Sequence, residues 1–337
     1  MQNIPSDQSP APFVVPAGKP SLSGHIQIAR IDHWFKNVFI LPGIAAALTI
    51  DSGNIKEGLP LRFFIGILSI CLIASSNYTI NEVLDAPFDR LHPVKCRRPT
   101  PAGLVNIPLS YVQWIGLMVI GVALGTLISP AFAITGFILW VMGCIYNIPP
   151  VRSKDLPYLD VLSEAVNNPL RMLAGWYLTG TTSIPPASLL FCYWMIGCYF
   201  MAMKRYAEYR DIGDPARAAG YRRSFAFYTE ERLMVSIMFY GTSAMLFLGA
   251  FIMRYKLELI LAFPFVALVM AIYLSLAFRK NSAVQRPEGL YKEPQLMLAV
   301  FVAVGLMGAL LMSNIPIMHQ IFAPTVPTSE RTAITNK

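Results

Sequence analysis

Long apolar runs recur along the whole chain, separated by polar connections. A helix needs about 20 apolar residues to cross the hydrocarbon core of a bilayer, which is roughly 30 Å thick. On that scale the pattern predicts nine membrane-spanning helices. The nine segments are 37–50, 60–80, 108–128, 131–148, 160–179, 186–203, 233–253, 258–278 and 295–317.

The composition agrees with this pattern. The chain has 337 residues, of which 55% are hydrophobic and 14% are charged. Soluble domains contain about 25% charged residues, so the composition excludes that class, and it also excludes a disordered chain or a disulfide scaffold. The five cysteines lie mostly in apolar segments without metal-ligand spacing, and we interpret them as packing residues. The predicted fold class is therefore an all-α membrane protein.

The distribution of basic residues predicts the orientation. Most of the 27 lysines and arginines lie in connections on the side of the N-terminus. The positive-inside rule then places the N-terminus in the cytoplasm and, with nine spans, the C-terminus outside. The net charge of +8 follows from this topology and does not indicate a nucleic-acid partner. We expect a multi-pass protein of the bacterial inner membrane.

The predicted transmembrane domain covers residues 30–319. Residues 1–29 are rich in proline and carry no signal-peptide pattern, so they are expected to form a disordered cytoplasmic tail. Residues 320–337 are expected to form a short tail on the other side of the membrane.

The strongest polar pattern stands at the cytoplasmic end of the second segment. Asn81, Asp85 and Asp89 are spaced i, i+4, i+8, which places them on one face of a helix. Pro87 offers an alternative in which the last turn breaks and Asp89 approaches from a loop. Carboxylates held in this way are ligands that Mg²⁺ uses when it also bridges substrate phosphates. The competing interpretation is a polar helix end in water, but polar stripes at membrane depth are costly and favour a function.

A second polar stripe runs along the fifth segment. Asp160, Glu164 and Asn168 have the same spacing, and Arg171 follows one turn deeper. An arginine at that depth costs about 2.5–3.5 kcal/mol on insertion scales and needs a partner. Two interpretations remain open here: residues that line a cavity, or a structural salt bridge between Arg171 and Glu164 or Asp160.

A third cluster lies between the sixth and seventh segments. Lys204, Glu208 and Asp211 share one helical face, and Arg205 neighbours Glu208 at i+3. Such a mixture can bind a metal through its acids and a phosphate through its bases. The basic run from 217 to 223 is interpreted as a solvated helix on the membrane surface.

Smaller candidates lie in other connections on the same side. They are Lys36 and Asn37 before the first segment, Arg97 and Arg98 after the first acidic stripe, and Tyr146 and Lys154 around the end of the fourth segment.

These motifs give the chain a resemblance to the UbiA superfamily of intramembrane prenyltransferases. The likeness rests on nine helices, on Asn81-xxx-Asp85-xxx-Asp89 after the second, and on the acidic cluster after the sixth. It implies a central cavity that opens to the cytoplasm and two acidic motifs that bind Mg²⁺ and a diphosphate. It also implies a polyprenyl lipid substrate.

Three stretches favour one branch, the decaprenyl-phosphate phosphoribosyltransferases. They are His33 to Val38, Asp89 to Pro93 with Arg98-Pro99, and Lys204 to Glu208. That branch transfers 5-phosphoribose from phosphoribosyl diphosphate to a polyprenyl phosphate. The loop from Pro149 to Pro157 looks more like prenyltransferases with aromatic acceptors, so prenyl transfer stays open as the alternative. A lipid or solute transporter is the alternative without chemistry.

The resemblance assigns roles to the candidates. Asn81, Asp85, Asp89, Glu208 and Asp211 would bind Mg²⁺, and Asp85 and Asp89 would thereby neutralise the leaving diphosphate. Arg171 would orient a lipid phosphate, whereas Tyr146 would shield an allylic cation in the prenyl version. The expected substrate contacts are Lys36, Asn37, Arg97, Arg98, Lys154, Asp160, Glu164, Lys204, Arg205 and Glu208.

Overall fold

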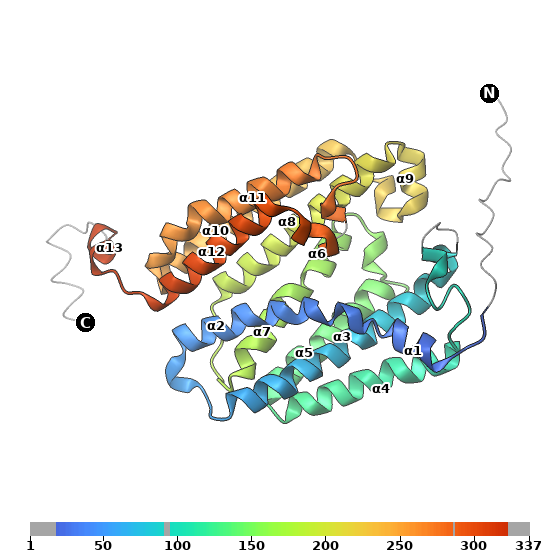
Figure 1. Ribbon diagram of the computed structural model, residues 1–337, viewed down its shortest axis with the longest axis horizontal. Coiled ribbons are helices and arrows are strands. Elements are labelled where there is room, and N and C mark those ends of the chain that lie inside the picture. Colours follow the sequence, from blue (N-terminus) through green and yellow to red (C-terminus); the bar gives the residue numbers. More distant parts are fainter. Residues whose placement is uncertain (1–17, 91–94, 286, 323–337) are drawn as a thin grey trace.

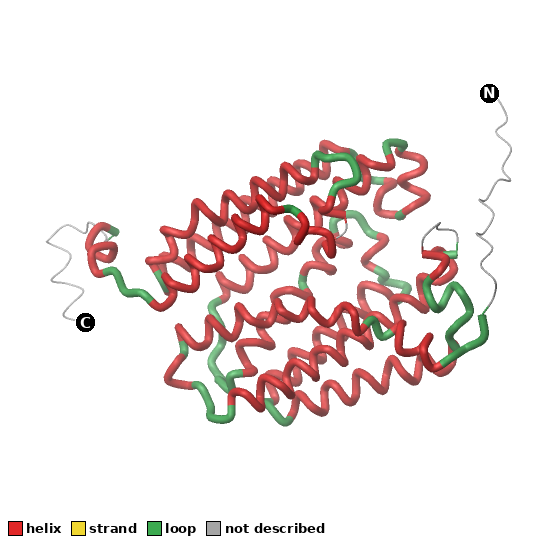
Figure 2. The backbone as a smooth tube through the Cα atoms, in the orientation of Figure 1, coloured by secondary structure: helices red, strands yellow, loops and turns green. Residues whose placement is uncertain are grey.

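The computed structural model describes residues 18–90, 95–285 and 287–322. All regular elements in these ranges are helical, in agreement with the predicted class (Figure 2). The predicted N-terminal tail lies outside the described residues up to residue 17, and the C-terminal tail from residue 323 onwards.

Eight helices in the described residues are long and apolar enough to cross a membrane. The first is a composite, in which α1 (Leu22–Ile28), the 3-10 helix η1 (Ile31–Ile40) and α2 (Leu41–Ile50) follow one another. The others are α3 (Leu59–Asp89), α4 (Ile107–Thr126), α5 (Pro130–Asn147), α8 (Ala187–Ile212), α10 (Glu230–Tyr255), η6 (Leu257–Ala262) with α11 (Phe263–Ala277), and α12 (Pro294–Met312).

Short helices connect or cap these spans. They are α9 (Pro215–Tyr221), α13 (Pro316–Ile321), η2 (Ser52–Asn54), η3 (Lys95–Arg97), η4 (Ser153–Asp155), η5 (Arg223–Ala226), η7 (Ala283–Gln285) and η8 (Pro287–Lys292). The helices α1 and α9 lie at one end of the long axis, and α13 lies at the other (Figure 1).

The predicted fifth segment is divided. It forms α6 (Leu159–Ala165) and α7 (Asn167–Leu178), which meet at Val166. Pro169 explains the break, because its nitrogen cannot donate to the carbonyl of Ala165 one turn earlier. This polar segment is not among the eight long apolar helices, so a ninth span stays a prediction.

Two helices run further than their apolar stretches. The helix α3 passes through Pro87 and ends at Asp89, so the first acidic pattern is helical throughout. The helix α8 ends at Ile212, with Gly213 as a left-handed C-cap (φ 69°). The third cluster therefore belongs to the last turns of α8 and does not follow it as a loop.

The helices form two groups, each with its own core (Figure 1). One core gathers Ile40, Ile70, Phe132 and Leu178 from η1, α3, α5 and α7. The other is built on α6, α8, α10, α11 and α12. The charged candidates come from both groups, since Asp85 belongs to the first and Arg205 to the second.

Close backbone contact joins α2 to α7. A Cβ atom at Gly43 would lie 1.8 Å from the carbonyl oxygen of Met172, and one at Gly175 would lie 2.0 Å from that of Ile40. Only glycine allows this approach at either position, because a larger side chain would meet backbone that cannot move aside. The contact fixes the depth of α7, and with it Arg171.

Candidate functional site

Asp85 is held by two bases from the loop after α5. Lys154 Nζ donates to Asp85 Oδ1 at 2.6 Å, and Arg152 Nη2 donates to the same oxygen at 2.9 Å. Lys154 also donates to Asn147 Oδ1 at 3.0 Å, and Asn81 Nδ2 donates to that same amide oxygen. The other carboxylate oxygen of Asp85 accepts no hydrogen bond from the residues that the structure describes.

Asp89 lies one helical turn further along α3. Arg98 Nη1 donates to Asp89 Oδ2 at 2.8 Å, and the second oxygen of this buried carboxylate has no hydrogen-bond donor within the described ranges. Glu82 anchors the segment that carries Arg98, because its Oε1 accepts from the N–H of Thr100 at 3.1 Å and from the hydroxyl at 3.2 Å. Asp85 and Asp89 thus each keep one open oxygen beside a fixed base.

Arg205 forms the centre of a second cluster. Its side chain is 1% exposed and donates to three acids: to Glu164 Oε2 at 2.7 Å, Asp160 Oδ2 at 3.2 Å and Glu208 Oε2 at 3.2 Å. A buried guanidinium needs such partners, because removing a charge from water without compensation is very costly. The planar donor set of arginine can serve all three carboxylates at once.

Asp160 is fully buried. Besides Arg205, it accepts from Tyr228 OH at 2.7 Å, from Ser224 Oγ at 3.2 Å and from Arg222 Nη1 at 3.4 Å. Burial and the neighbouring carboxylate raise the pKa of Tyr228, which keeps its hydroxyl protonated as a donor. With no exposed surface, Asp160 positions Arg205 in this arrangement, and its contact with substrate stays a prediction.

The end of α5 joins the two clusters. Tyr146 OH donates to Glu164 Oε2 at 2.8 Å, in the Arg205 cluster. Asn147, the next residue, accepts from Lys154 in the Asp85 cluster. The Lys154 ammonium also lies 5.8 Å from the centroid of the Tyr146 ring. The two acidic groups therefore belong to one continuous polar network.

Arg171 makes a different contact from the salt bridge that was considered. Its Nε donates to Asn37 Oδ1 at 2.9 Å, and Asn37 Nδ2 donates to Cys71 Sγ at 3.1 Å. Glu164 and Asp160 are ion-paired with Arg205 instead. The interpretation of Arg171 as the salt-bridge partner of either acid is wrong. The pair of Arg171 and Asn37 remains a predicted substrate contact.

Glu208 and Asp211, the second predicted half of the metal site, have separate partners in the described residues. Glu208 accepts from Arg205, whereas Asp211, one helical turn later, accepts from Gln285 Nε2 and from the backbone N–H of Asn281. Asp211 is exposed, and within the described residues it shares no partner with Glu208. A shared metal site for these two acids stays a prediction.

Three predicted bases form no direct bond to Asp85 or Asp89 in the described residues. Lys36 Nζ lies 5.9 Å from the centroid of the Phe35 ring, Arg97 is exposed, and Lys204 is half-buried beside Arg205. Phosphate contacts from these long side chains stay predictions.

Asp85 and Asp89 fit a Mg²⁺ ion that is bound partly by protein and partly by substrate phosphate. No group of three His, Cys, Asp or Glu side chains with the arrangement of a metal site occurs in the described ranges. Mg²⁺ is commonly bound by one or two carboxylates together with waters and substrate phosphates. Within the described residues, Asp85 and Asp89 each keep one carboxylate oxygen without a hydrogen-bond donor, one turn apart, which matches such a phosphate-bridged ion.

The sequence analysis gives no role to some members of the network. Asn147 and Arg152 lie beside Tyr146 and Lys154 around the end of the fourth predicted segment, and their part in the network follows only from the packing. Arg222 was assigned to a solvated helix but donates to buried Asp160, so that interpretation is wrong for this residue. No local pattern distinguishes Arg222 from its exposed neighbour Arg223.

Known proteins resemble the chain over most of its length. A decaprenyl-phosphate phosphoribosyltransferase from Mycobacterium tuberculosis is 29% identical over 217 residues, covering 63% of this chain and 68% of that protein. The enzyme of that name from Corynebacterium glutamicum is 28% identical over 191 residues, covering 55% and 54%.

Solved structures share the fold. A UbiA homologue from Archaeoglobus fulgidus, bound to GPP and Mg²⁺, superimposes with a TM-score of 0.65 at 18% identity, covering 86% of this chain and all of that one. The family model of the UbiA prenyltransferase family matches residues 38–291. The chain is thus an integral, multi-pass membrane protein that belongs to the UbiA prenyltransferase family and lies near its decaprenyl-phosphate phosphoribosyltransferases.

Proposed function

We propose that the protein is a Mg²⁺-dependent transferase that moves 5-phosphoribose from phosphoribosyl diphosphate to a polyprenyl phosphate. The observation that carries this proposal is the group of Lys154, Arg152 and Arg98 around two half-open carboxylates. Such a site can bind a diphosphate through its bases and a bridging cation through its acids. The similarity to phosphoribosyltransferases of two bacteria supports the choice of donor.

The reaction would break the bond between the anomeric carbon and the diphosphate oxygen, and the leaving diphosphate would take the electron pair. An oxygen of the lipid phosphate would form the new bond to that carbon. Mg²⁺, held by Asp85 and Asp89, would neutralise charge on the leaving group. Lys154 and Arg152 would donate hydrogen bonds to the same diphosphate, because they already lie within 2.9 Å of Asp85 Oδ1.

The other parts of the site would hold the acceptor in place. Arg171, which Asn37 orients, would bind the lipid phosphate from the deeper side. Arg205 fixes Glu164 and Glu208, so it would shape the wall of the site. We propose that these residues line a central cavity that opens to the cytoplasm. We also propose that α6 and α7 together complete a ninth span and that residues 30–319 form the transferase domain.

Prenyl transfer is the second candidate. A solved UbiA homologue with this fold was bound to GPP and Mg²⁺. In that version Tyr146 would face an allylic cation, although its hydroxyl is engaged with Glu164 in the present arrangement.

Product formation by purified protein in detergent separates the two reactions. One mixture contains radiolabelled phosphoribosyl diphosphate and decaprenyl phosphate, and the other contains a polyprenyl diphosphate with a panel of aromatic acceptors. We expect labelled lipid in the first mixture only, and its loss on addition of EDTA. Product in the second mixture alone, or in neither, would contradict the proposal.

The pH dependence of transfer should report Lys154. Burial lowers the pKa of this ammonium from its ordinary 10.5, and the charge of Asp85 opposes that shift only in part. The positive charge is therefore lost at a lower pH than on an exposed lysine, so the rate should fall early on the alkaline side. The Lys154→Arg variant keeps its charge, and its alkaline limb should lie at higher pH.

The measurement is the initial rate from about pH 7 to pH 10, a range in which an exposed lysine largely keeps its charge. The matched control is Lys280→Arg, at an exposed lysine. Its profile should coincide with that of the unchanged protein. Identical alkaline limbs for Lys154→Arg and the unchanged protein would remove Lys154 from the diphosphate site.

A further inference from the structure

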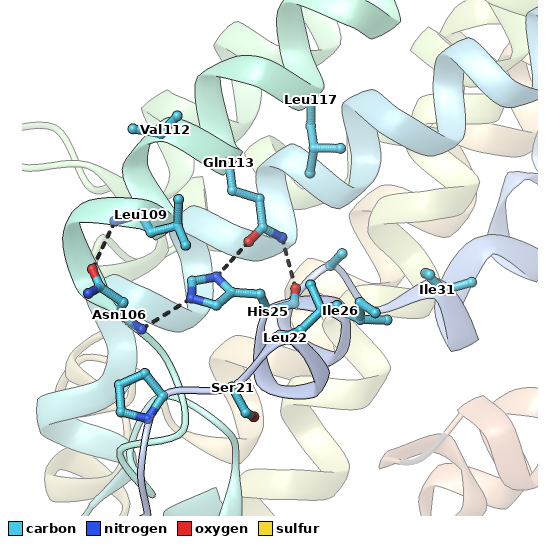
Figure 3. Close-up of a pocket in the computed structure, with 12 residues that line it drawn as sticks. Ser21, Leu22, His25, Ile26, Ile31, Asn106, Leu109, Val112, Gln113 and Leu117 are labelled. Atoms are coloured by element: carbon cyan, nitrogen blue, oxygen red, sulfur yellow. Dashed lines mark hydrogen bonds between the residues drawn. The ribbon is translucent and has the colours of Figure 1, made fainter.

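An apolar groove lies between α1 and the first turns of α4 (Figure 3). Its volume is about 710 Å³. Leu22, Ile26, Leu109 and Val112 line it, and each leaves half or more of its surface exposed. Because α4 is one of the helices long and apolar enough to cross a membrane, its exposed apolar face beside the groove is suited to contact with lipid.

Hydrogen bonds around His25 hold the walls of the groove in place (Figure 3). The N–H of Asn106 donates to His25 Nε2 at 3.2 Å, so the ring proton is on Nδ1, which donates to Gln113 Oε1 at 2.9 Å. Gln113 Nε2 donates back to the carbonyl of His25 at 2.9 Å. The groove therefore exists before any ligand binds.

A polar cavity of about 470 Å³ continues from the groove. Ile26 and Ile31 line both spaces, and Arg30 and Arg98 line the polar one. Arg98 is the base that donates to Asp89. The groove thus leads from an exposed apolar surface to Arg98, the side chain that donates to Asp89.

Arg30 is the residue of this cavity whose charge remains available. Its backbone is left-handed (φ 50°), and its guanidinium lies 5.8 Å from the centroid of the Tyr78 ring. Asp32 pairs with His33, and Glu82 accepts from Thr100. Within the part of the chain that the structure describes, the Arg30 guanidinium forms no ion pair. An anion can therefore approach it without displacing a carboxylate.

We propose that the groove and the polar cavity together form an entry docking site for an isoprenoid monophosphate, with its chain between α1 and α4 and its phosphate against Arg30, from which the phosphate passes on to Arg171 for the transfer. The site suits an amphiphile, because its apolar groove can hold a hydrocarbon chain and its polar cavity offers the Arg30 guanidinium to a phosphate. The choice of an isoprenoid chain rests on the proposed function, in which this lipid is the acceptor.

The test measures equilibrium binding of radiolabelled farnesyl phosphate to the full-length protein in detergent, without phosphoribosyl diphosphate and with EDTA. Val112→Trp fills the groove, and Val119→Trp is its control, because Val119 lies two turns along the same face of α4 outside the groove. We expect a loss of affinity of tenfold or more for Val112→Trp and none for Val119→Trp. Elution as a folded species is checked for each variant.

The Arg30→Gln variant tests the phosphate half of the site. This variant should lower the affinity for farnesyl phosphate by tenfold or more. The binding of farnesol, which lacks the phosphate, should be unchanged. Unchanged binding of farnesyl phosphate to Val112→Trp, or to Arg30→Gln, overturns the proposal.

The docking site and the proposed function can fail separately. If farnesyl phosphate binding depends on Val112 and Arg30 but the protein makes no phosphoribosyl lipid, the docking site is supported and the proposed function is contradicted. If the Val112→Trp variant transfers phosphoribose with an unchanged KM for the lipid, the proposed function is supported and the docking site is contradicted.

Discussion

Replacing Asp85 by asparagine should lower the rate of phosphoribosyl transfer by about 100-fold or more, a loss of roughly 2.7 kcal/mol in transition-state stabilisation. Asparagine keeps the shape of the side chain but removes the negative charge. The variant loses a carboxylate that fits Mg²⁺, and it no longer attracts Lys154 and Arg152, which both donate to Asp85 Oδ1. Initial rates at increasing Mg²⁺ concentration measure the effect. Asp89→Asn should show the same direction, because its carboxylate holds Arg98.

The matched control is Asp214→Asn. Asp214 is exposed and caps α9 by accepting from the N–H of Arg217 at 2.7 Å. Asparagine caps a helix about as well, so this change from acid to amide should leave both the fold and the rate intact. An Asp85→Asn variant that retained its rate within threefold, with the same Mg²⁺ requirement, would show that the catalytic cation is not held at Asp85.

The second large effect is on stability. Arg205→Met removes the guanidinium that pairs with Asp160, Glu164 and Glu208. Asp160 is fully buried, and removal of a buried partner costs about 3–5 kcal/mol. We expect the lower end of that range, because Arg222, Ser224 and Tyr228 still donate to Asp160. Denaturant unfolding in detergent measures this loss.

A second substitution identifies the cause. Adding Glu164→Gln to Arg205→Met removes one of the carboxylates that would repel each other, so it should restore part of the stability. Arg217→Met is the control, because Arg217 is exposed, and a change there should stay within about 0.5 kcal/mol. Equal stability of Arg205→Met and Arg217→Met would mean that the Arg205 cluster contributes nothing to the fold.

The periodicity of apolar residues predicts most of the fold because a bilayer imposes one length on every span. Eight of the predicted segments correspond to long apolar helices. The exception is the segment of α6 and α7, where Pro169 was the available signal for the break at Val166. At Pro87 the same residue type leaves α3 intact to Asp89, so proline alone does not determine where a helix ends.

The candidate site was predicted in its residue types but not in its pairing. Spacing along a helix brings Asn81, Asp85 and Asp89 to one face, since i, i+4 neighbours are local. The contact of Arg205 with Glu164 joins residues 41 positions apart, and that of Lys154 with Asp85 joins residues 69 apart. These pairs depend on how α3, α5, α6 and α8 pack, which no local pattern encodes.

The last turn of α5 has a consequence for how the two clusters respond to ligands. Tyr146 and Asn147 are consecutive, yet one bonds to Glu164 and the other to Lys154. A shift of this turn that suits one cluster must strain the other. Occupancy at Asp85 will then change the affinity of the Arg205 side, and thermodynamic reciprocity requires an equal effect in return. Ligands at the two clusters would therefore weaken each other's binding, with two neighbouring residues as the mechanical link.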